Sequence, residues 1–198
     1  MLVNVISDLH KSTKRNFIER MTPDKPECMT VARAYGFDYW DGERKYGFGG
    51  YKKDDRWKPV AQKLVNMYGL SSRSRVLDVG CGKGYLGWEI QRLTGCSVVG
   101  TDISDYALER CWINSFKHDI GKDRIHGDYD LILSINVLHN LSLPELKHAL
   151  KEINVHCFYS YICMDSYRDE KELHNLQCWA LTAEQFHKPE EWEFLFDE

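Results

Sequence analysis

The sequence predicts a three-layer α/β/α sandwich of the Rossmann-like type, in which helices cover both faces of a mostly parallel, doubly wound sheet. Short apolar runs alternate with helix-like segments from residue 59 onward, which is the order of βα units. Residues 75–93 have the order strand, glycine turn, helix, which is typical of a nucleotide-binding unit. Polar residues close five predicted strands, and the carboxyl ends of parallel strands form the ligand edge of such sheets.

The amino-terminal part, residues 1–58, is expected to form a lid segment that closes over the ligand edge of an α/β domain, residues 59–198, and the two are expected to make one compact unit. Residues 1–45 are polar and show no sustained period, so they are expected to be helical or irregular. The loop 44–57, RKYGFGGYKKDDRW, has two interpretations. Aromatic packing could stabilise it as a turn-rich loop, or its glycines could admit a ligand whose carboxylate pairs with Arg56.

The glycine turn carries the most specific pattern. Asp78 precedes three alternate glycines, Gly80, Gly82 and Gly84, and Asp102 ends the next apolar run. An acid in that second position accepts hydrogen bonds from ribose hydroxyls in nucleotide-binding folds. The dinucleotide pattern has wider glycine spacing and no preceding acid, so an NAD-dependent oxidoreductase is disfavoured.

The other elements follow in chain order. A proline suits the start of a helix at residue 59, and apolar residues at helical spacing predict a helix over 85–93. The run 156–164 is almost continuously apolar or aromatic, which predicts a central strand covered on both faces. The remaining expected elements are strand 97–101, a helix capped by Ser104 or Asp105 and running to Arg110, a weakly patterned strand within 115–120, strand 128–134, a helix from the capping box Ser142–Glu145, and helices over 170–178 and 190–196.

Composition excludes several classes of protein. The net charge of −4 and the pI near 6.1 give no electrostatic footprint for nucleic acid, so an RNA acceptor is disfavoured. No apolar run reaches the length of a membrane span, and Met1–His10 does not have the pattern of a signal peptide. Seven scattered cysteines without a CxxC pair are expected to be reduced, which predicts a cytoplasmic protein.

The glycine motif with its two acids resembles motif I of the class I S-adenosylmethionine-dependent methyltransferases. Four further segments, KYGFGGYKKDDRWKPVA, LILSINVLHNL, DSYRDE and WALTAEQFHKPEEW, are similar to a bacterial subgroup of that family found with capsule, lipopolysaccharide or other surface-polysaccharide biosynthesis. The likeness covers nearly the whole chain. It implies S-adenosylmethionine as cofactor and a small polar acceptor, such as a sugar, a sugar nucleotide or a phosphorylated glycan precursor.

The resemblance also implies roles for individual residues. Those implied to hold the cofactor are Tyr46, Gly49 and Arg56 over its carboxylate, Asp78, Gly80 and Gly82 at its methionine and ribose part, Asp102 at the ribose hydroxyls, Asp119 at the adenine amine, and Asn136 and Val137 at the methionine end. The section between Asp102 and the fourth strand is short for the family, which weakens the assignment of Asp119.

Methyl transfer to a hydroxyl needs alignment and a base. His139 follows the fourth strand and titrates near neutrality, so it is the candidate base; the alternative is that it only orients the loop or caps the next helix. Asn140, Asp165, Tyr167 and Arg168 are the candidates for acceptor binding. Magnesium prefers oxygen ligands, so His139, Asp165 and His187 make a poor match and no metal site is predicted.

The chain ends where the family normally continues with an antiparallel β-hairpin, so this hairpin is expected to be missing. An uncovered sheet edge favours a homodimer. The competing function is a non-catalytic, truncated S-adenosylmethionine-binding module that serves in protein interactions. A protein methyltransferase is a further possibility that the sequence leaves open.

Overall fold

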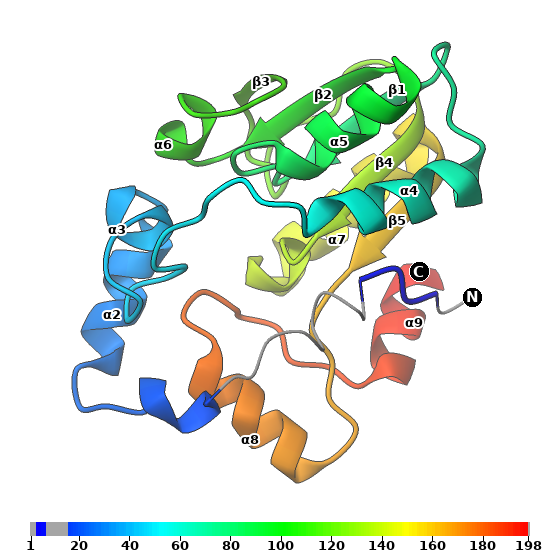
Figure 1. The fold of residues 1–198 in the computed structure, drawn as a ribbon. Coiled ribbons are helices and arrows are strands. Elements are labelled where there is room, and N and C mark those ends of the chain that lie inside the picture. The colour runs from blue at the N-terminus through cyan, green and yellow to red at the C-terminus, as the bar shows by residue number, and fades with distance from the viewer. Residues whose placement is uncertain (1–2, 7–15, 198) are drawn as a thin grey trace.

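The computed structural model describes residues 3–6 and 16–197. Its sheet has five strands in the order β3-β2-β1-β4-β5, and every neighbouring pair is parallel (Figure 1). The predicted Rossmann-like fold with a parallel sheet is therefore confirmed. The strands are β1 (Arg75–Val79), β2 (Ser97–Asp102), β3 (Asn114–Lys117), β4 (Tyr129–Ile135) and β5 (Cys157–Cys163).

Helices cover both faces of the sheet because successive side chains of a strand point to opposite sides. On one face, Val76 of β1 and Leu131 of β4 pack with α4 (Trp57–Tyr68) and α5 (Tyr85–Thr94). On the other face, Leu77 and Ile132 pack with α7 (Leu143–His156) and with Trp192 of α9 (Pro189–Asp197). Figure 1 shows α4 and α5 in front of the sheet and α7 behind it. The two cores lie between the three predicted layers, which are the helices on one face, the sheet and the helices on the other face.

Local sequence signals set the helix boundaries. Helix α4 ends at Gly69, whose φ of 61° is left-handed, and α7 begins with the predicted capping box of Ser142 and Glu145. The Ser104 side chain accepts the Ala107 amide and caps α6 (Asp105–Leu108), which stops before the predicted end at Arg110. The third strand is shorter than the predicted 115–120 range.

The expectation of a central fifth strand is wrong. Among the residues that the structure describes, β5 pairs with β4 alone and forms the sheet edge. Phe158 is 79% exposed and Tyr159 is 48% exposed, so the apolar run is only partly covered. An apolar run alone cannot distinguish a central strand from an edge strand, since both have the same local pattern.

The amino-terminal segment forms η1 (Phe17–Arg20), α2 (Lys25–Arg33) and α3 (Phe37–Trp40) beyond the carboxyl ends of the strands (Figure 1). There η1 lies beside α8 (Glu170–Trp179), and Arg20 and Lys25 donate hydrogen bonds to backbone carbonyls at the end of that helix. Residues 1–2 and 7–15 of the predicted lid lie outside the described residues. Within the described ranges, the structure has no helix long and apolar enough to cross a membrane.

Candidate functional site

A cavity of about 710 Å³ lies at the carboxyl ends of β1, β2 and β4. The strand ends supply one side, an aromatic group from the amino-terminal segment supplies a second, and the segment before α9 supplies part of the rim. The lining includes the strand-end group Gly80, Cys81, Gly82, Asp102, His118, Asp119, Asn136, Val137 and Asn140, the aromatic group Tyr35, Tyr39, Trp40, Phe48, Tyr51 and Trp57, and the polar group Arg33, Asp54, Arg56, Lys122, Glu145, Thr182 and Glu184.

The glycine positions of the turn after β1 have no room for side chains. The amides of Gly80 and Cys81 donate to Thr101 O at 2.7 and 2.9 Å, which fixes the turn to β2. Gly80 has φ 72°, and a Cβ there would lie 2.2 Å from Val137 Cγ2; Gly82 has φ 55°, and its Cβ would lie 2.6 Å from the Trp40 ring. Glycine is therefore required both for the backbone conformation and for the close packing.

Asp102 occupies the end of β2 and lines the cavity, as the sequence predicts. Its Oδ2 accepts the Gly82 amide at 2.8 Å and its Oδ1 accepts the Ser104 amide at 2.9 Å. Burial raises the pKa of Asp102, although these backbone amides act in the opposite direction. A ligand that donates hydroxyl hydrogens to this carboxylate would stabilise its charged form.

Asp78 lies in β1 but is not among the residues that line the cavity. It is buried, and a Cβ added to Gly87 of α5 would come within 3.4 Å of Asp78 Oδ2. Burial, followed by the charges of Cys111 and Asp102, raises the pKa of Asp78 to about 7. The structure thus places this acid beneath the glycine turn, on the side that faces α5.

His118 and Asp119 follow β3 and both line the cavity. Asp119 Oδ1 accepts the Gly121 amide at 3.1 Å and Oδ2 accepts Lys122 Nζ at 2.8 Å, so the carboxylate also holds its own turn. His118 Nε2 lies 3.2 Å from Arg124 O, a carbonyl that can only accept, so Nε2 is the donor and Nδ1 is the nitrogen that can act as an acceptor in the neutral ring. Among the described residues this buried Nδ1 has no hydrogen-bond partner.

The turn after β4 brings Asn136, Val137 and Asn140 to the cavity. Asn136 has φ 59°, a left-handed conformation that is uncommon for residues other than glycine, and its amide donates to Cys163 O at 2.8 Å. Such strained residues concentrate at functional sites. The buried Oδ1 of Asn140 has no hydrogen-bond partner within the described part of the chain, so it is an acceptor available to a ligand.

His139 lies on the same turn, in η2 (Leu138–Asn140), yet its side chain is buried and is not part of the cavity lining. Its carbonyl accepts the amides of Glu184 and Gln185, which ties the segment before α9 to this turn. Burial lowers the pKa of His139, while the nearby charge of Asp165 acts in the opposite direction. The neutral imidazole, which is the form that accepts a proton, is therefore favoured near pH 7.

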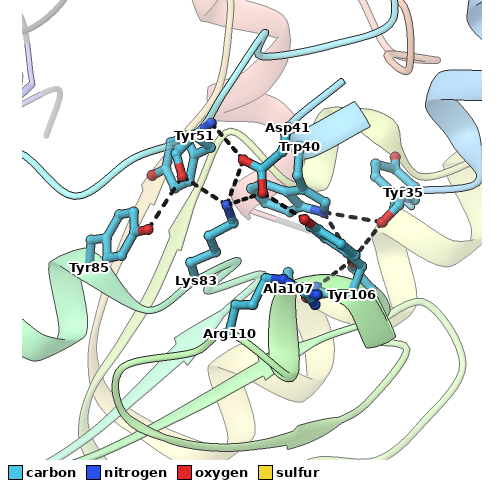
Figure 2. A network of polar contacts seen from close by, with 10 residues as sticks. Tyr35, Trp40, Asp41, Tyr51, Lys83, Tyr85, Tyr106, Ala107 and Arg110 are labelled. Atoms are coloured by element: carbon cyan, nitrogen blue, oxygen red, sulfur yellow. Dashed lines mark hydrogen bonds and ion pairs between the residues drawn. The ribbon is translucent and has the colours of Figure 1, made fainter. Parts of the chain in front are cut away.

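A polar network ties the amino-terminal segment to the glycine turn (Figure 2). The buried ammonium of Lys83 donates to both carboxylate oxygens of Asp41 at 2.7 Å and to Tyr51 O at 2.9 Å. The Tyr106 hydroxyl donates to Asp41 Oδ2 at 2.8 Å. Burial would raise the pKa of Asp41, but the hydrogen bonds from Lys83 and Tyr106 outweigh it and the pKa is lowered.

The same network continues through Trp40 to the carboxyl end of β2, where Asp102 lies. Trp40 Nε1 donates to Ser104 Oγ at 2.9 Å and to Tyr35 O at 3.1 Å (Figure 2). Ser104 is also the residue whose amide binds Asp102. The aromatic side of the cavity is therefore held by hydrogen bonds to the elements that carry the glycine turn and the acid. We call the segment 35–51 the aromatic roof.

The predicted ligand loop contributes unevenly to the cavity. Arg56 lines it, with Nε bound to Asp54 at 2.8 Å and 2.7 Å. Tyr46 and Gly49 do not line it: Tyr46 packs on the small core around Cys28, and a Cβ on Gly49 would meet the Arg44 side chain at 3.0 Å. One loop thus combines aromatic packing with an arginine that lines the cavity.

Three candidate acceptor residues also lie outside the lining. The Asp165 carbonyl accepts Trp192 Nε1 at 3.2 Å, and the Tyr167 amide donates to His187 O at 3.4 Å. Arg168 pairs with Glu172 and its side chain is 79% exposed. Only Asn140 of the four predicted acceptor residues reaches the cavity. Among the residues the structure describes, no group of three or more His, Cys, Asp or Glu side chains could hold a metal ion.

Sequence reasoning missed the aromatic roof, the Lys83–Asp41 pair and His118. Lys83 stands inside the motif GCGKG, and an ammonium next to a glycine turn is a signal that could have predicted a carboxylate partner. The sequence gives a weaker signal for the role of Trp40, because Gly82, the residue of the turn on which it packs, is distant in sequence.

The chain is similar to known methyltransferases over part of its length. Residues 77–157 match a family described as methyltransferase domain. The chain is 27% identical to a sterol 24-C-methyltransferase of Clavispora lusitaniae, covering 82% of this chain and 58% of that protein. It is 33% identical to a sterol 24-C-methyltransferase of Schizosaccharomyces pombe over 121 residues, covering 52% of this chain and 32% of that protein. This chain therefore spans about a third to three fifths of the length of these relatives.

A solved structure of an S-adenosylmethionine-dependent methyltransferase from Archaeoglobus fulgidus has the same fold. The TM-score is 0.57 at 23% identity, and the match covers 76% of this chain and 69% of that one. The matched domain begins in β1 and ends at the start of β5, so it includes the strand ends that form the cavity.

Proposed function

We propose that this chain, whose residues 77–157 match the methyltransferase domain family, is an S-adenosylmethionine-dependent methyltransferase that acts on a small-molecule acceptor. The observation that carries the proposal is the cavity at the strand ends of this domain, with Asp102 and the glycine turn in its lining. The cofactor supplies a methyl group already activated on a sulfonium, so the protein has to bind, orient and exclude water.

The donors and acceptors of the cavity fit a nucleoside. Asp102 offers carboxylate oxygens to ribose hydroxyls, and His118 Nδ1 offers a buried, unpartnered acceptor to an exocyclic amine beside Asp119. Asn136 and Val137 lie at the next strand end, where the methionine part would lie. Arg56 would meet the methionine carboxylate, which has to compete with Asp54 for the guanidinium. Asp78 is buried between the glycine turn and α5, outside the cavity lining.

The acceptor is expected against the aromatic roof and the rim. Tyr35, Tyr39 and Phe48 offer ring faces, and Arg33, Glu184 and Asn140 offer hydrogen bonds. A sugar or another ring with polar substituents presents both kinds of surface, which supports the proposal of O-methylation of a sugar, sugar nucleotide or phosphorylated surface-glycan precursor. Asp165, Tyr167 and Arg168 would contact such an acceptor only if the segment after β5 moves toward the cavity.

His139 is proposed as the residue that takes the hydroxyl proton. Its neutral imidazole is the required form, and Asn140 beside it in the chain lines the cavity. Because the ring is buried below the lining, the proton has to reach it through a water or after a small shift of the η2 turn. Turnover should fall at least ~100-fold in His139→Gln with cofactor affinity retained, since general-base catalysis typically contributes that much. Equal turnover would remove His139 as the base.

A second acceptor class is favoured by the aromatic lining and by the curated relatives, which are named as sterol methyltransferases. It is an apolar ring system that packs on Tyr39, Trp40 and Phe48. An assay for S-adenosylhomocysteine release with parallel panels of sugar nucleotides and sterols distinguishes the two classes. Cofactor binding with no turnover on either panel would instead favour the non-catalytic interaction module.

The binding test uses calorimetric titration of S-adenosylmethionine into the wild-type chain and two variants. Asp102→Ala removes the ribose acceptor and should weaken binding at least ~10-fold, which is the effect of one charged hydrogen bond. Asp105→Ala is the matched control, because it removes a nearby exposed carboxylate that binds Lys117 outside the cavity. If both variants bind as tightly as the wild type, the proposed cofactor site is wrong.

Two broader predictions remain proposals. The edge strand β5, which exposes Phe158, and the neighbouring end of α7, which exposes Val155, support a homodimer, and sedimentation of the wild type and of Phe158→Lys tests it. The seven free cysteines support a reducing, cytoplasmic location, which cell fractionation tests.

A further inference from the structure

Two cysteines lie near each other at the glycine turn. Cys81 lies in the glycine turn and lines the cavity, and Cys111 follows α6. The two chain segments lie side by side, because the Trp112 amide donates to Lys83 O at 3.0 Å. The Cys81 thiol donates to Gly82 O at 3.5 Å, and the electrostatics of the pair couple it to Cys111. Both cysteines are free and partly exposed.

Each sulfur atom packs against a glycine, in space that a side chain at that glycine would fill. A Cβ on Gly84 would lie 2.6 Å from Cys111 Sγ, and a Cβ on Gly100 would lie 2.5 Å from Cys81 Sγ. Both would-be Cβ atoms also approach the Ile113 side chain, at 2.9 and 3.0 Å. The two thiols therefore share one small compartment under the glycine turn, bounded by Ile113.

The pair is chemically unequal. The hydrogen bond from Cys81 lowers the pKa of Cys111 to about 6, helped by Ser115 and the amides of Ile113 and Trp112 and opposed by burial. The same hydrogen bond and burial raise the pKa of Cys81. At neutral pH the arrangement is a thiolate next to a thiol, which is the arrangement of oxidation-sensitive cysteines with a resolving partner. Burial raises the pKa of four others, Cys28, Cys96, Cys157 and Cys163.

We propose that Cys81 and Cys111 are an oxidation site, at which a hydroperoxide converts the two thiols into a disulfide that closes the cavity to its nucleoside ligand. The Cys111 thiolate attacks the peroxide, its sulfur is oxidised to the sulfenic acid, and the O–O bond breaks to release hydroxide. The Cys81 sulfur then attacks the Cys111 sulfur, forming the S–S bond; the sulfenic oxygen leaves as water with the thiol proton. Two thiols and one hydrogen peroxide give one disulfide and two waters.

The bond would change the cavity because Cys81 belongs to its lining. A disulfide holds two sulfurs at about 2.05 Å, closer than any hydrogen bond between them, so Cys81 has to move toward Cys111. The turn has little freedom to follow, since Val137 and Trp40 pack directly on Gly80 and Gly82. The loss of ligand binding rests on the proposed function, whereas formation of the disulfide does not.

The experiment treats the reduced, full-length chain with hydrogen peroxide and splits each sample for two readouts. Peptide mapping by mass spectrometry under non-reducing conditions identifies the cross-linked peptides. Calorimetry with S-adenosylmethionine measures binding before oxidation, after oxidation and after dithiothreitol. Cys111→Ser removes the reactive thiol outside the cavity lining, and Cys157→Ser is the matched control at the opposite end of the sheet, where Cys157 begins β5.

We expect a Cys81–Cys111 peptide, at least ~10-fold weaker binding after peroxide, and recovery with dithiothreitol, in both the wild type and Cys157→Ser. Cys111→Ser should form no such peptide and keep its affinity after peroxide. Absence of the cross-link in the wild type, or a cross-link that leaves affinity unchanged, would overturn the proposal. If the reduced wild type does not bind the cofactor at all, the proposed function fails, and peptide mapping still decides whether the disulfide forms.

Discussion

Replacing Asp78 by asparagine is expected to stabilise the folded chain at and above neutral pH. Asp78 is 5% exposed in β1, and burial with the charges of Cys111 and Asp102 raises its pKa from 3.8 to about 7. The folded state therefore keeps a proton that the unfolded chain releases, so the free energy of unfolding falls as pH rises from about 4 to about 7 and then stays low. A difference of about three pH units corresponds to about 4 kcal/mol.

The assay is urea unfolding of the wild type and Asp78→Asn at pH 4 and pH 8. The variant should be about 4 kcal/mol more stable than the wild type at pH 8, as an upper value, and about equally stable at pH 4. Asp105→Asn is the control, because it removes an exposed carboxylate of the same type instead of a buried one. A free-energy difference between wild type and Asp78→Asn that is the same at both pH values would refute the reasoning. It would mean that ionisation of Asp78 does not destabilise the folded state.

Three further predictions concern the glycine turn, the aromatic roof and the strand-four turn. Gly80→Ala should destabilise the fold by about 1–3 kcal/mol and abolish cofactor binding, because the new methyl would lie 2.2 Å from Val137, whereas Gly69→Ala has the same left-handed strain but no atom within 4 Å; equal effects on binding would refute this. Lys83→Met should weaken cofactor binding ~10-fold and expose the roof to limited proteolysis, because the roof loses a charged hydrogen bond worth about 1.5–3 kcal/mol; unchanged cleavage would contradict it. Loss of stability of the wild type as pH falls below 6.5 should be smaller in His139→Gln, because burial lowers the folded pKa and favours the neutral ring; unfolding curves with identical pH dependence would count against it.

The pattern-bearing elements were predictable from sequence because their signals are local. The strand, glycine turn and helix at residues 75–94, the acid Asp102 and the capping box at Ser142 each follow from neighbouring residues. Their meeting at one edge follows from parallel pairing alone. For that reason Gly80, Asp102 and Asn136 all reach the cavity.

The rest depends on contacts between distant parts of the chain, which local patterns do not contain. Trp40 packs on Gly82, and Lys83 binds Asp41, across an interval of 42 residues in each case. Tertiary packing also decides that β5 is an edge strand and that the His139 ring lies below the cavity lining. Neither result changes the hydropathy pattern from which a sequence-based prediction starts.

The central claim is that the cavity binds S-adenosylmethionine through the glycine turn and Asp102. Calorimetric titration of the reduced wild-type chain beside Asp102→Ala tests it most directly. We predict one binding site per chain in the wild type and at least ~10-fold weaker binding in the variant. No heat of binding at millimolar cofactor, or equal affinity in both proteins, would contradict the claim.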